Sequence, residues 1–384
     1  MAGRIVLFGA TGYTGRLTAD AMVERGLRPV LAARGREKLD AMASELGGLE
    51  VAVADVADPS SVKALVEKGD VLVTTVGPFV RFGSAAAAGA ATAGAHYLDS
   101  TGEPLFIRQV FERYGLVADR SGCGMITAFG YDFVPGNLAG AIALERAGQD
   151  AVRVDTGYFF TGAADAGAMS GGTRASLLGA LTAPGFVYRD DRVHTERGAK
   201  RYRTFPVGGK RLGAVSVGTS EHFALPRLAP QLREVNAYLG WFGSASRAMQ
   251  VMSAGSSAAM KLPGAERLVS SLSERFAPGS TGGPDEQTRA KSGSHIVAIA
   301  YDAAGRPLAE VHVTGVDGYT FTGRLLAWGA ERAAAGGLKG TGALGPVDAF
   351  GLDELRDGCA QAGMGEDGAP TPAAAEKATA AAGG

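Results

Sequence analysis

Three glycines, at positions 9, 12 and 15, have the spacing of a loop that binds phosphate. They follow the apolar run Ile5-Val-Leu-Phe8 and precede a helical pattern, so the order is strand, tight turn and helix. Backbone N–H groups at a helix N-terminus attract an anion, and glycines let the pyrophosphate of a dinucleotide approach them closely. The predicted pyrophosphate loop comprises Gly9, Ala10, Thr11, Gly12, Tyr13 and Thr14.

Basic residues follow the second predicted strand, residues 29–33. Arg34 stands where an NAD-selective site usually has an acidic residue that accepts a hydrogen bond from the ribose 2′-hydroxyl. Arg34, with Arg36 and Lys38 close behind it, instead forms a cation cluster that suits the 2′-phosphate of NADP, because cationic groups donate charge-assisted hydrogen bonds to phosphate. We therefore predict NADP(H) as the cofactor. The alternative, a solvent-exposed basic start to the second helix, is compatible with it.

The third and fourth predicted strands end in further candidate cofactor residues. Asp55 follows the third strand, residues 49–54, at a place where an adenine amino group would be read. An equally good interpretation makes Asp55 a helix cap before Pro59. Residues 70–76 form a β-branched run typical of a central parallel strand, and they lead into the cofactor candidates Val76, Gly77 and Pro78.

Strands and helices alternate along residues 1–150, which predicts a Rossmann-type, doubly wound parallel sheet of the α/β class. Ligands of such sheets bind beyond the carboxyl ends of the strands, so the loops at 77–83, 99–104 and 130–137 should converge on the site. The rhythm then changes to longer strands, such as 294–301 and 307–314, which form a predicted hairpin.

We therefore predict a domain division along the chain. Residues 1–150 form the NADP-binding domain, 151–336 a mixed α+β substrate domain, and 337–364 a segment that returns to the first domain. The composition of residues 365–384 predicts a disordered tail. Helices are expected near residues 171–182, 244–261, 264–275 and 320–335.

Composition and missing motifs exclude several classes of function. The net charge of −1 gives no electrostatic footprint for nucleic acid. No signal-peptide pattern and no apolar run of membrane-spanning length are present, and two distant cysteines suit a reducing compartment, so we expect a cytoplasmic protein. The chain lacks Tyr-x-x-x-Lys, His-Glu-x-x-His, Gly-x-Ser-x-Gly, Cys-x-x-Cys and a Walker loop, which argues against metal and nucleophile mechanisms.

Six motifs, in order along residues 1–355, resemble the saccharopine dehydrogenase-like oxidoreductases, and most closely the bacterial trans-acting enoyl reductases of polyketide lipid synthesis. They are Gly9-Ala-Thr-Gly-Tyr-Thr-Gly15, Val76-Gly-Pro-Phe79, residues 99–104, Gly130-Tyr-Asp-Phe-Val-Pro135, Ser170-Gly-Gly-Thr173 and Gly318-Tyr-x-x-Thr322. The resemblance implies an NADP-binding Rossmann domain, a smaller α+β substrate domain and reduction of a C=C or C=N bond. Family members commonly have Ser-Asp or Asp-x-Gly where this chain has Pro135-Gly136-Asn137.

The candidate catalytic residues are Tyr131, Asp132 and Glu103. For an enoyl thioester, an enolate oxygen develops, which a neutral donor such as the Tyr131 hydroxyl would stabilise. For an imine, carboxylates such as Asp132 or Glu103 would favour the cationic acceptor and assist proton transfer. Each also has a structural interpretation: Tyr131 as packing behind the nicotinamide, Asp132 as a brace of its own turn, and Glu103 as a supporting residue.

A substrate-binding segment is also predicted. Ser170, Thr173 and Arg174 stand at a predicted helix start and suit a substrate carboxylate or phosphate, although a plain helix cap fits them equally.

The first functional hypothesis is an NADPH-dependent reductase of a C=C bond in an enoyl thioester, bound to a carrier or to CoA, or in a related metabolite. One alternative is a saccharopine-type C–N oxidoreductase, and another is a non-catalytic NADPH-binding sensor or assembly protein. The partner is then a small-molecule or carrier-bound acyl substrate. The oligomeric state is left open, with a homodimer as the candidate.

Overall fold

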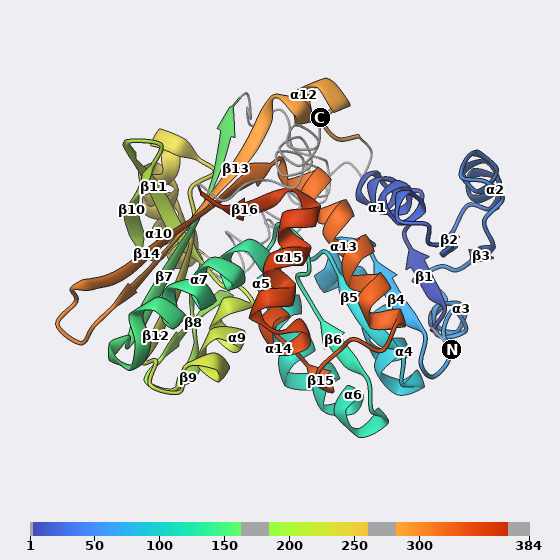
Figure 1. Cartoon of the computed structure of the whole chain (residues 1–384), viewed down its shortest axis with the longest axis horizontal. Helices are drawn as coiled ribbons and strands as arrows, with labels where there is room; N and C mark the ends of the chain where they lie inside the picture. The colour runs from blue at the N-terminus through green and yellow to red at the C-terminus, as the bar shows by residue number, and fades with distance from the viewer. Residues whose placement is uncertain (1–2, 163–183, 260–281, 368–384) are drawn as a thin grey trace, which may run out of the picture.

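The computed structural model describes residues 3–162, 184–259 and 282–367. Two sheets lie next to each other, with helices α7, α13 and α15 in the region where the two halves of the molecule meet (Figure 1). We call the seven-stranded sheet, sheet A, and the nine-stranded sheet, sheet B.

Sheet A is parallel, and its strand order is β15-β6-β5-β4-β1-β2-β3. Strands β1, β2 and β4 consist of buried residues, mostly aliphatic, as expected for strands covered on both faces. The predicted doubly wound sheet is confirmed. Its strands are β1 (Ile5–Phe8), β2 (Val30–Ala33), β3 (Val51–Val53), β4 (Val71–Thr74), β5 (His96–Asp99), β6 (Gly124–Ile126) and β15 (Gly342–Ala343).

Helices cover both faces of sheet A. Helix α4 contacts strands β4 and β5 and also packs against helices α3 and α6. Helix α1 packs against helix α13, and α13 contacts strands β1, β4 and β5. The helices of this first stretch of chain are α1 (Tyr13–Glu24), α2 (Arg36–Glu45), α3 (Pro59–Lys63), α4 (Phe79–Ala93), α5 (Pro104–Gln109), a π-helical segment (Val110–Tyr114) and α6 (Gly115–Ser121).

Sheet B is mixed. Seven of its strands follow the order β10-β11-β12-β7-β13-β14-β16, and β8 pairs with both β12 and β9. Strands β12 and β7 are parallel, whereas the other strand pairs of this sheet in the described residues are antiparallel. The predicted hairpin is confirmed as β13 and β14. The strands of sheet B are β7 (Arg153–Gly162), β8 (Pro184–Arg189), β9 (Arg192–Arg197), β10 (Tyr202–Val207), β11 (Lys210–Val217), β12 (Glu234–Leu239), β13 (Ser292–Tyr301), β14 (Pro307–Val316) and β16 (Met364–Glu366).

The remaining helices follow β6 in the chain. They are α7 (Val134–Ala147), α9 (Glu221–Leu228), α10 (Ser246–Ala259), α12 (Glu286–Ala290), α13 (Gly318–Ala334), α14 (Pro346–Phe350) and α15 (Leu352–Ala362), with 3₁₀ turns at Gly148–Asp150 and Gly243–Ala245. One continuous apolar core runs through both halves, and a smaller cluster lies on sheet B around Phe159 and Phe205.

The predicted boundaries at 150 and 336 differ from the places where packing changes. Helix α7, within 1–150, packs on β13 and β14 of sheet B, whereas α13, within 151–336, packs on sheet A. The chain therefore crosses between the halves earlier than its strand pattern indicates. Residues 337–364 contribute β15 to the edge of sheet A beside β6.

The first two residues of the predicted tail belong to a strand instead. Gly365 and Glu366 belong to β16, which pairs with β14, because a strand edge offers backbone partners to even a small-residue segment. Residues 368–384 lie outside the described part of the chain. Among the described helices, none has both the length and the apolar character needed to cross a bilayer.

Candidate functional site

The glycine loop connects β1 to α1 and leaves the helix N-terminus open. Gly9 has a φ of +93°, and the Gly12 N–H donates to the Gly9 carbonyl at 2.9 Å. Gly12 is the N-cap of α1, and no side chain caps the helix. The first N–H groups of a helix have no intrahelical partner, so this end fits a pyrophosphate. Pyrophosphate binding by this loop stays a prediction.

Gly9 also brings the second predicted cofactor loop close. A Cβ on Gly9 would lie 2.8 Å from both Thr75 Oγ1 and Val76 Cγ2, and the Thr75 hydroxyl donates to the Gly9 carbonyl at 3.2 Å. Gly77 and Pro78 follow directly. The two loops therefore meet at the carboxyl ends of β1 and β4, which are neighbours in sheet A.

Arg34 stands at the carboxyl end of β2, the strand next to β1, and its side chain is exposed. Arg36 is committed to Asp40, with both carboxylate oxygens 2.9 Å from its Nε. Within the described residues, Arg34 and the exposed Lys38 have no ion-pair partner. This placement leaves the cations of Arg34 and Lys38 available to an anion beyond the end of β2.

Asp55 is held by its own turn, since its Oδ1 accepts a hydrogen bond from the Ala57 N–H at 2.9 Å. The alternative prediction that Asp55 caps the helix starting at Pro59 is wrong. Helix α3 is capped by Asp58, whose side chain accepts a hydrogen bond from the Ser60 N–H. The reason is spacing, because Asp58 directly precedes Pro59 at the first helical position.

Glu103 braces the loop that precedes α4. Its two carboxylate oxygens accept hydrogen bonds from the Phe79 N–H at 2.7 Å and the Val80 N–H at 3.0 Å. These are the first two N–H groups of α4, directly after Pro78. Glu103 thereby ties the end of β5 to the second cofactor loop, and its buried carboxylate interacts favourably with the helix N-terminus.

Asp132 lies where the loops after β5 and β6 meet. A Cβ on Gly102 would stand 2.7 Å from its Oδ2, so the two loops are in contact. Its Oδ1 is buried and has no hydrogen-bond partner among the described residues. Burial, and secondarily the charge of Glu221, raises the pKa of Asp132 to about 7. A carboxyl group that titrates near neutral pH can serve as a general acid.

Tyr131 lies in the wall between the two halves. Its ring stacks against Phe160 and Trp241 of the sheet B half, with centroids 5.4 and 6.1 Å away. Its hydroxyl donates to the Phe159 carbonyl at 3.3 Å, and its N–H donates to Thr322 Oγ1 at 3.0 Å. Burial raises the pKa of Tyr131 far above its usual range, so the hydroxyl is neutral.

Asp99 links the ends of β5 and β6. Its Oδ1 accepts hydrogen bonds from the Thr101 and Ala128 N–H groups, both at 2.9 Å. Burial raises the pKa of Asp99 to about 6. Because its side chain is fully buried and bonded to the backbone of both loops, it sets their spacing.

Sequence reasoning missed an ionisable group that packs behind Asp132. Glu221, the first residue of α9, is fully buried, and its Oε1 accepts a hydrogen bond from the Tyr158 hydroxyl at 2.5 Å. Burial raises the pKa of Glu221 to about 7. Only the pairing within sheet B brings Tyr158 to this place, so spacing in the chain carried no signal for the contact.

The Pro135-Gly136-Asn137 segment differs from the pattern of the predicted resemblance, and close neighbours explain why position 136 has no side chain. A Cβ there would stand 2.0 Å from the Tyr158 hydroxyl oxygen and 2.5 Å from Glu221 Oε1. Asn137 donates from Nδ2 to the Phe133 carbonyl and to Ser220 Oγ, both at 2.9 Å. The departure therefore accommodates the buried pair and connects α7 to the start of α9.

The predicted substrate residues Ser170, Thr173 and Arg174 lie outside the described residues, as do the expected helices near 171–182 and 264–275.

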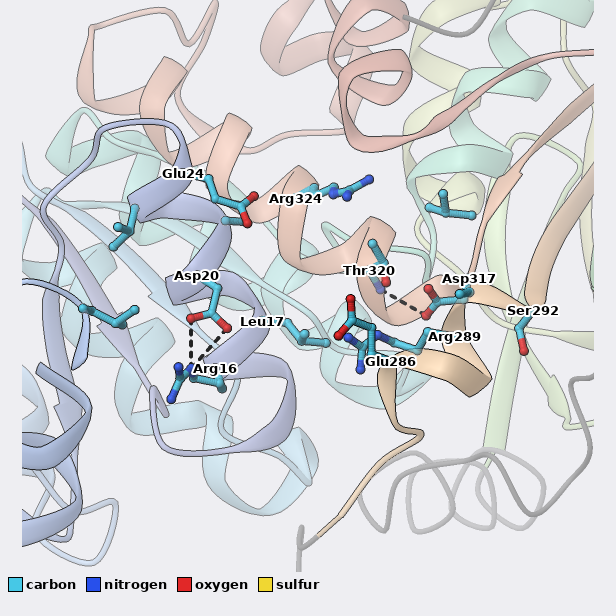
Figure 2. Close-up of a pocket in the computed structure, with 15 residues that line it drawn as sticks. Arg16, Leu17, Asp20, Glu24, Glu286, Arg289, Ser292, Asp317, Thr320 and Arg324 are labelled. Carbon is cyan, nitrogen blue, oxygen red and sulfur yellow. Dashed lines mark hydrogen bonds and ion pairs between the residues drawn. The ribbon is translucent and has the colours of Figure 1, made fainter. Parts of the chain in front are cut away.

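A cavity of about 750 Å³ lies on the outer side of α1, between α1, α12 and α13 (Figure 2). Side chains of both charges line it, including the Arg16 and Asp20 ion pair on α1. None of the predicted cofactor or catalytic residues is among its lining residues. Next to it, Arg289 Nη1 donates to the Tyr13 hydroxyl at 2.9 Å, and that hydroxyl donates to the Pro284 carbonyl at 2.5 Å. The glycine loop is thus tied to the second half.

Comparisons with known proteins agree with this geometry. Residues 9–101 match a family described as NAD(P)H-binding. The chain is 39% identical over 140 residues to the trans-acting enoyl reductase of Mycobacterium leprae, and the aligned segment covers 35% of this chain and 34% of that protein. It is 36% identical over 152 residues to the trans-acting enoyl reductase of Mycobacterium ulcerans, and that segment covers 38% of this chain and 36% of that protein.

Part of the chain is similar in sequence to the trans-acting enoyl reductases. The matched segments span less than half of these curated relatives, 44% at most for a Mycobacterium tuberculosis protein that is 36% identical over 184 residues. The fold is that of apo saccharopine dehydrogenase (L-Glu forming) from Saccharomyces cerevisiae, with a TM-score of 0.58 at 15% identity over 95% of this chain and 99% of that one. Both parts of the predicted resemblance are confirmed, and the cofactor is a nicotinamide dinucleotide.

Proposed function

We propose that the chain is an NADPH-dependent oxidoreductase that reduces the C=C bond of an enoyl thioester bound to CoA or to a carrier protein. The names of its homologues support this reaction. The observation that carries the proposal is the meeting of loops at the carboxyl edge of sheet A. There the open helix end of the glycine loop, the Val76 loop and Asp132 are joined through Thr75, Glu103 and Gly102.

The cofactor site uses the predicted residues. The glycine loop, residues 9–14, holds the pyrophosphate, and Val76, Gly77 and Pro78 line the path toward the nicotinamide. Arg34 and Lys38 bind the 2′-phosphate, because they are the cations left without an acidic partner at the end of β2 among the described residues. Asp55 stands at the adenine end. The bound cofactor supplies the hydride.

Asp132 supplies the complementary proton. Reduction of an enoyl thioester places negative charge on the carbonyl oxygen and the α-carbon, so the site needs a neutral donor. A carboxyl with a pKa of about 7 is protonated in a large fraction of molecules at neutral pH. Glu103 fixes the cofactor loop, and Tyr131 forms the wall against which the substrate half packs.

A direct assay tests the proposal. We expect purified protein to oxidise NADPH in the presence of crotonyl-CoA or a longer enoyl-CoA, and to produce the saturated acyl-CoA in equal amount. The same series loaded onto a phosphopantetheinylated carrier protein measures the effect of the carrier. Saturable NADPH binding without turnover of any enoyl thioester would instead support the non-catalytic alternative.

A second candidate function, saccharopine-type reduction of an imine, is favoured by the paired buried carboxyls of Asp132 and Glu221. If both were ionised they would stabilise an iminium ion. Incubation with NADPH, an amino acid and an aldehyde or keto acid tests this reaction. A rate seen only with these substrates would replace the enoyl thioester by an imine in the proposal.

Coenzyme preference gives the first prediction. Arg34→Ala is expected to weaken NADPH binding by about 10- to 100-fold while changing NADH binding little, because one charge-assisted hydrogen bond to phosphate is lost. Fluorescence titration with both coenzymes measures this. Arg36→Ala is the matched control, since Arg36 is bound to Asp40 and should retain the preference. Equal affinities of the unmodified protein for both coenzymes would contradict the NADP assignment.

A further inference from the structure

We propose that Glu221 is a positioning residue that keeps Asp132 protonated near neutral pH by holding the negative charge of the pair on itself. The proposal deepens the proposed function, because it assigns a residue of the second half to the acid of that reaction. It is argued from the hydrogen bonds that each carboxyl group receives and from the space that surrounds them.

The first observation is the close packing between Glu221 and the Asp132 loop. Gly136, four residues after Asp132, lies so near that a Cβ would overlap both Glu221 Oε1 and the Tyr158 hydroxyl. The same hydroxyl lies 3.0 Å from the carbonyl oxygen of Phe133, the residue after Asp132. Glu221 therefore packs against the segment that follows Asp132, whose side chain is half-buried, and a negative charge on one carboxyl group disfavours a charge on the other.

The second observation is that the two carboxyl groups receive different hydrogen bonds. Glu221 Oε1 accepts from the Tyr158 hydroxyl at 2.5 Å and from the Thr156 hydroxyl at 3.3 Å. Within the described residues, Asp132 accepts none. One oxygen of each carboxyl group, Asp132 Oδ1 and Glu221 Oε2, is buried and unpartnered, so the two groups differ in the bonds that Glu221 Oε1 receives. Hydrogen-bond donors stabilise an ionised carboxylate. When one proton is shared, it therefore resides on Asp132 and the charge on Glu221.

Among the described residues, few other titratable groups face this pair. Tyr131 and Tyr158 are buried, and burial holds the pKa of each above its usual range, so both stay neutral. Burial also lowers the pKa of His222 to about 3, with Arg201 nearby adding to the effect, so this histidine carries no compensating charge. Glu103 is next to Gly102, but its carboxylate is bonded to the N-terminus of α4.

The β-carbon of the enoyl group accepts a hydride, and with it two electrons, which a bound nicotinamide cofactor would supply. The Oδ–H bond of Asp132 breaks and a C–H bond forms at the α-carbon, which leaves the saturated acyl group and an Asp132 carboxylate. Water then returns a proton to Asp132. While Asp132 is the protonated member of the pair, Glu221 carries the negative charge, and this charge makes reprotonation of Asp132 favourable near pH 7.

Infrared titration of the buried carboxyl groups tests the pairing without turnover. We expect the unmodified protein to show a protonated-carboxyl C=O band that disappears near pH 7 and is absent in Asp132→Asn. In Glu221→Gln the band of Asp132 should titrate about 1 pH unit lower, because the neighbouring charge is gone. An unshifted band in Glu221→Gln, or no such band in the unmodified protein at pH 6.5, would overturn the proposal.

The pH dependence of kcat/KM is the second readout. Since the acid must be protonated, Glu221→Gln should lose about tenfold at pH 8 and keep nearly the full rate at pH 5. A merely structural role predicts an equal loss at both values. The matched control is Glu234→Gln, a half-buried carboxylate of the same half that is paired with Arg189, and it should leave the profile unchanged.

The proposed function and the positioning role of Glu221 can fail separately. If enoyl thioesters are not reduced but the infrared shift is found, the proposed function fails and the Asp132 and Glu221 pairing stands. If reduction occurs and Glu221→Gln shifts neither the band nor the profile, the positioning role fails alone. If Glu221→Gln does not fold, the unmodified protein still tests the proposal, because the protonated-carboxyl band of Asp132 must disappear near pH 7.

Discussion

Asp132→Asn is expected to lower kcat by about 10²- to 10⁴-fold with an enoyl thioester, the range found when a general acid is removed. Asparagine has nearly the same shape and fits beside Gly102, but it has no acidic proton to donate. The coenzyme Kd should remain the same, because no cofactor loop contacts are lost. Steady-state kinetics and coenzyme titration of the variant provide the two measurements.

The pH profile and a neighbouring variant complete this test. In the unmodified protein the rate should fall as pH rises through about 7, since deprotonation removes the acid, and Asp132→Asn should lack this dependence. Tyr131→Phe should lose much less, because the hydroxyl already donates to the Phe159 carbonyl. If Asp132→Asn keeps the full rate, or if Tyr131→Phe alone abolishes turnover, Asp132 is not the acid.

Gly15→Ala is expected to abolish measurable NADPH binding and to lower the free energy of unfolding by about 1–3 kcal/mol, the cost of overpacking. A Cβ there would stand 2.1 Å from the Gly9 carbonyl oxygen and 2.9 Å from Ala10 Cα. Both neighbours are backbone atoms, so the loop that holds the pyrophosphate must move. Urea unfolding and fluorescence titration with NADPH measure the two effects.

Gly89→Ala serves as its control, because Gly89 is also within a helix, α4, and the atom nearest to an added Cβ is 3.5 Å away. That substitution should leave binding unchanged and stabilise the helix by up to about 1 kcal/mol. Normal coenzyme affinity in Gly15→Ala would show that the glycine loop does not hold the phosphate.

The cofactor half of the molecule could be predicted because its signals are local. The strand, turn and helix around Gly9, Gly12 and Gly15 lie within a short stretch of chain, and buried parallel strands have a recognisable apolar composition. The contact between the Gly9 and Val76 loops followed from a general rule about the carboxyl edges of parallel sheets. Arg34 follows β2 as its place in the chain predicts.

The second half was harder to predict. Strands β8 to β11 were not predicted, although β8 pairs with β9 and β10 with β11 in local hairpins, because they contain basic residues and are only partly buried. Glu221 was missed because its contacts are distant in the chain. It stands 89 residues after Asp132 in the chain, and only the pairing of β7 and β12 brings the Tyr158 strand and α9 to the Asp132 loop.

Helix α13 shows that packing can override a domain division drawn along the chain. Its pattern predicted a helix at 320–335 correctly, but nothing local says which sheet it covers. Gly323 of α13 lies against the Leu17 backbone of α1, which allows the two helices to approach closely.

The position of α13 and β15 has a consequence for biosynthesis. Sheet A begins near residue 5, yet its cover α13 and its edge strand β15 belong to residues 318–343. During synthesis, the strands of sheet A near the N-terminus therefore leave the ribosome long before α13 and β15, which shield the apolar surface of the sheet, have been made. We infer that the nascent chain stays incompletely folded until synthesis is nearly finished, and that truncation before residue 318 yields an aggregation-prone product rather than a freestanding nucleotide-binding module.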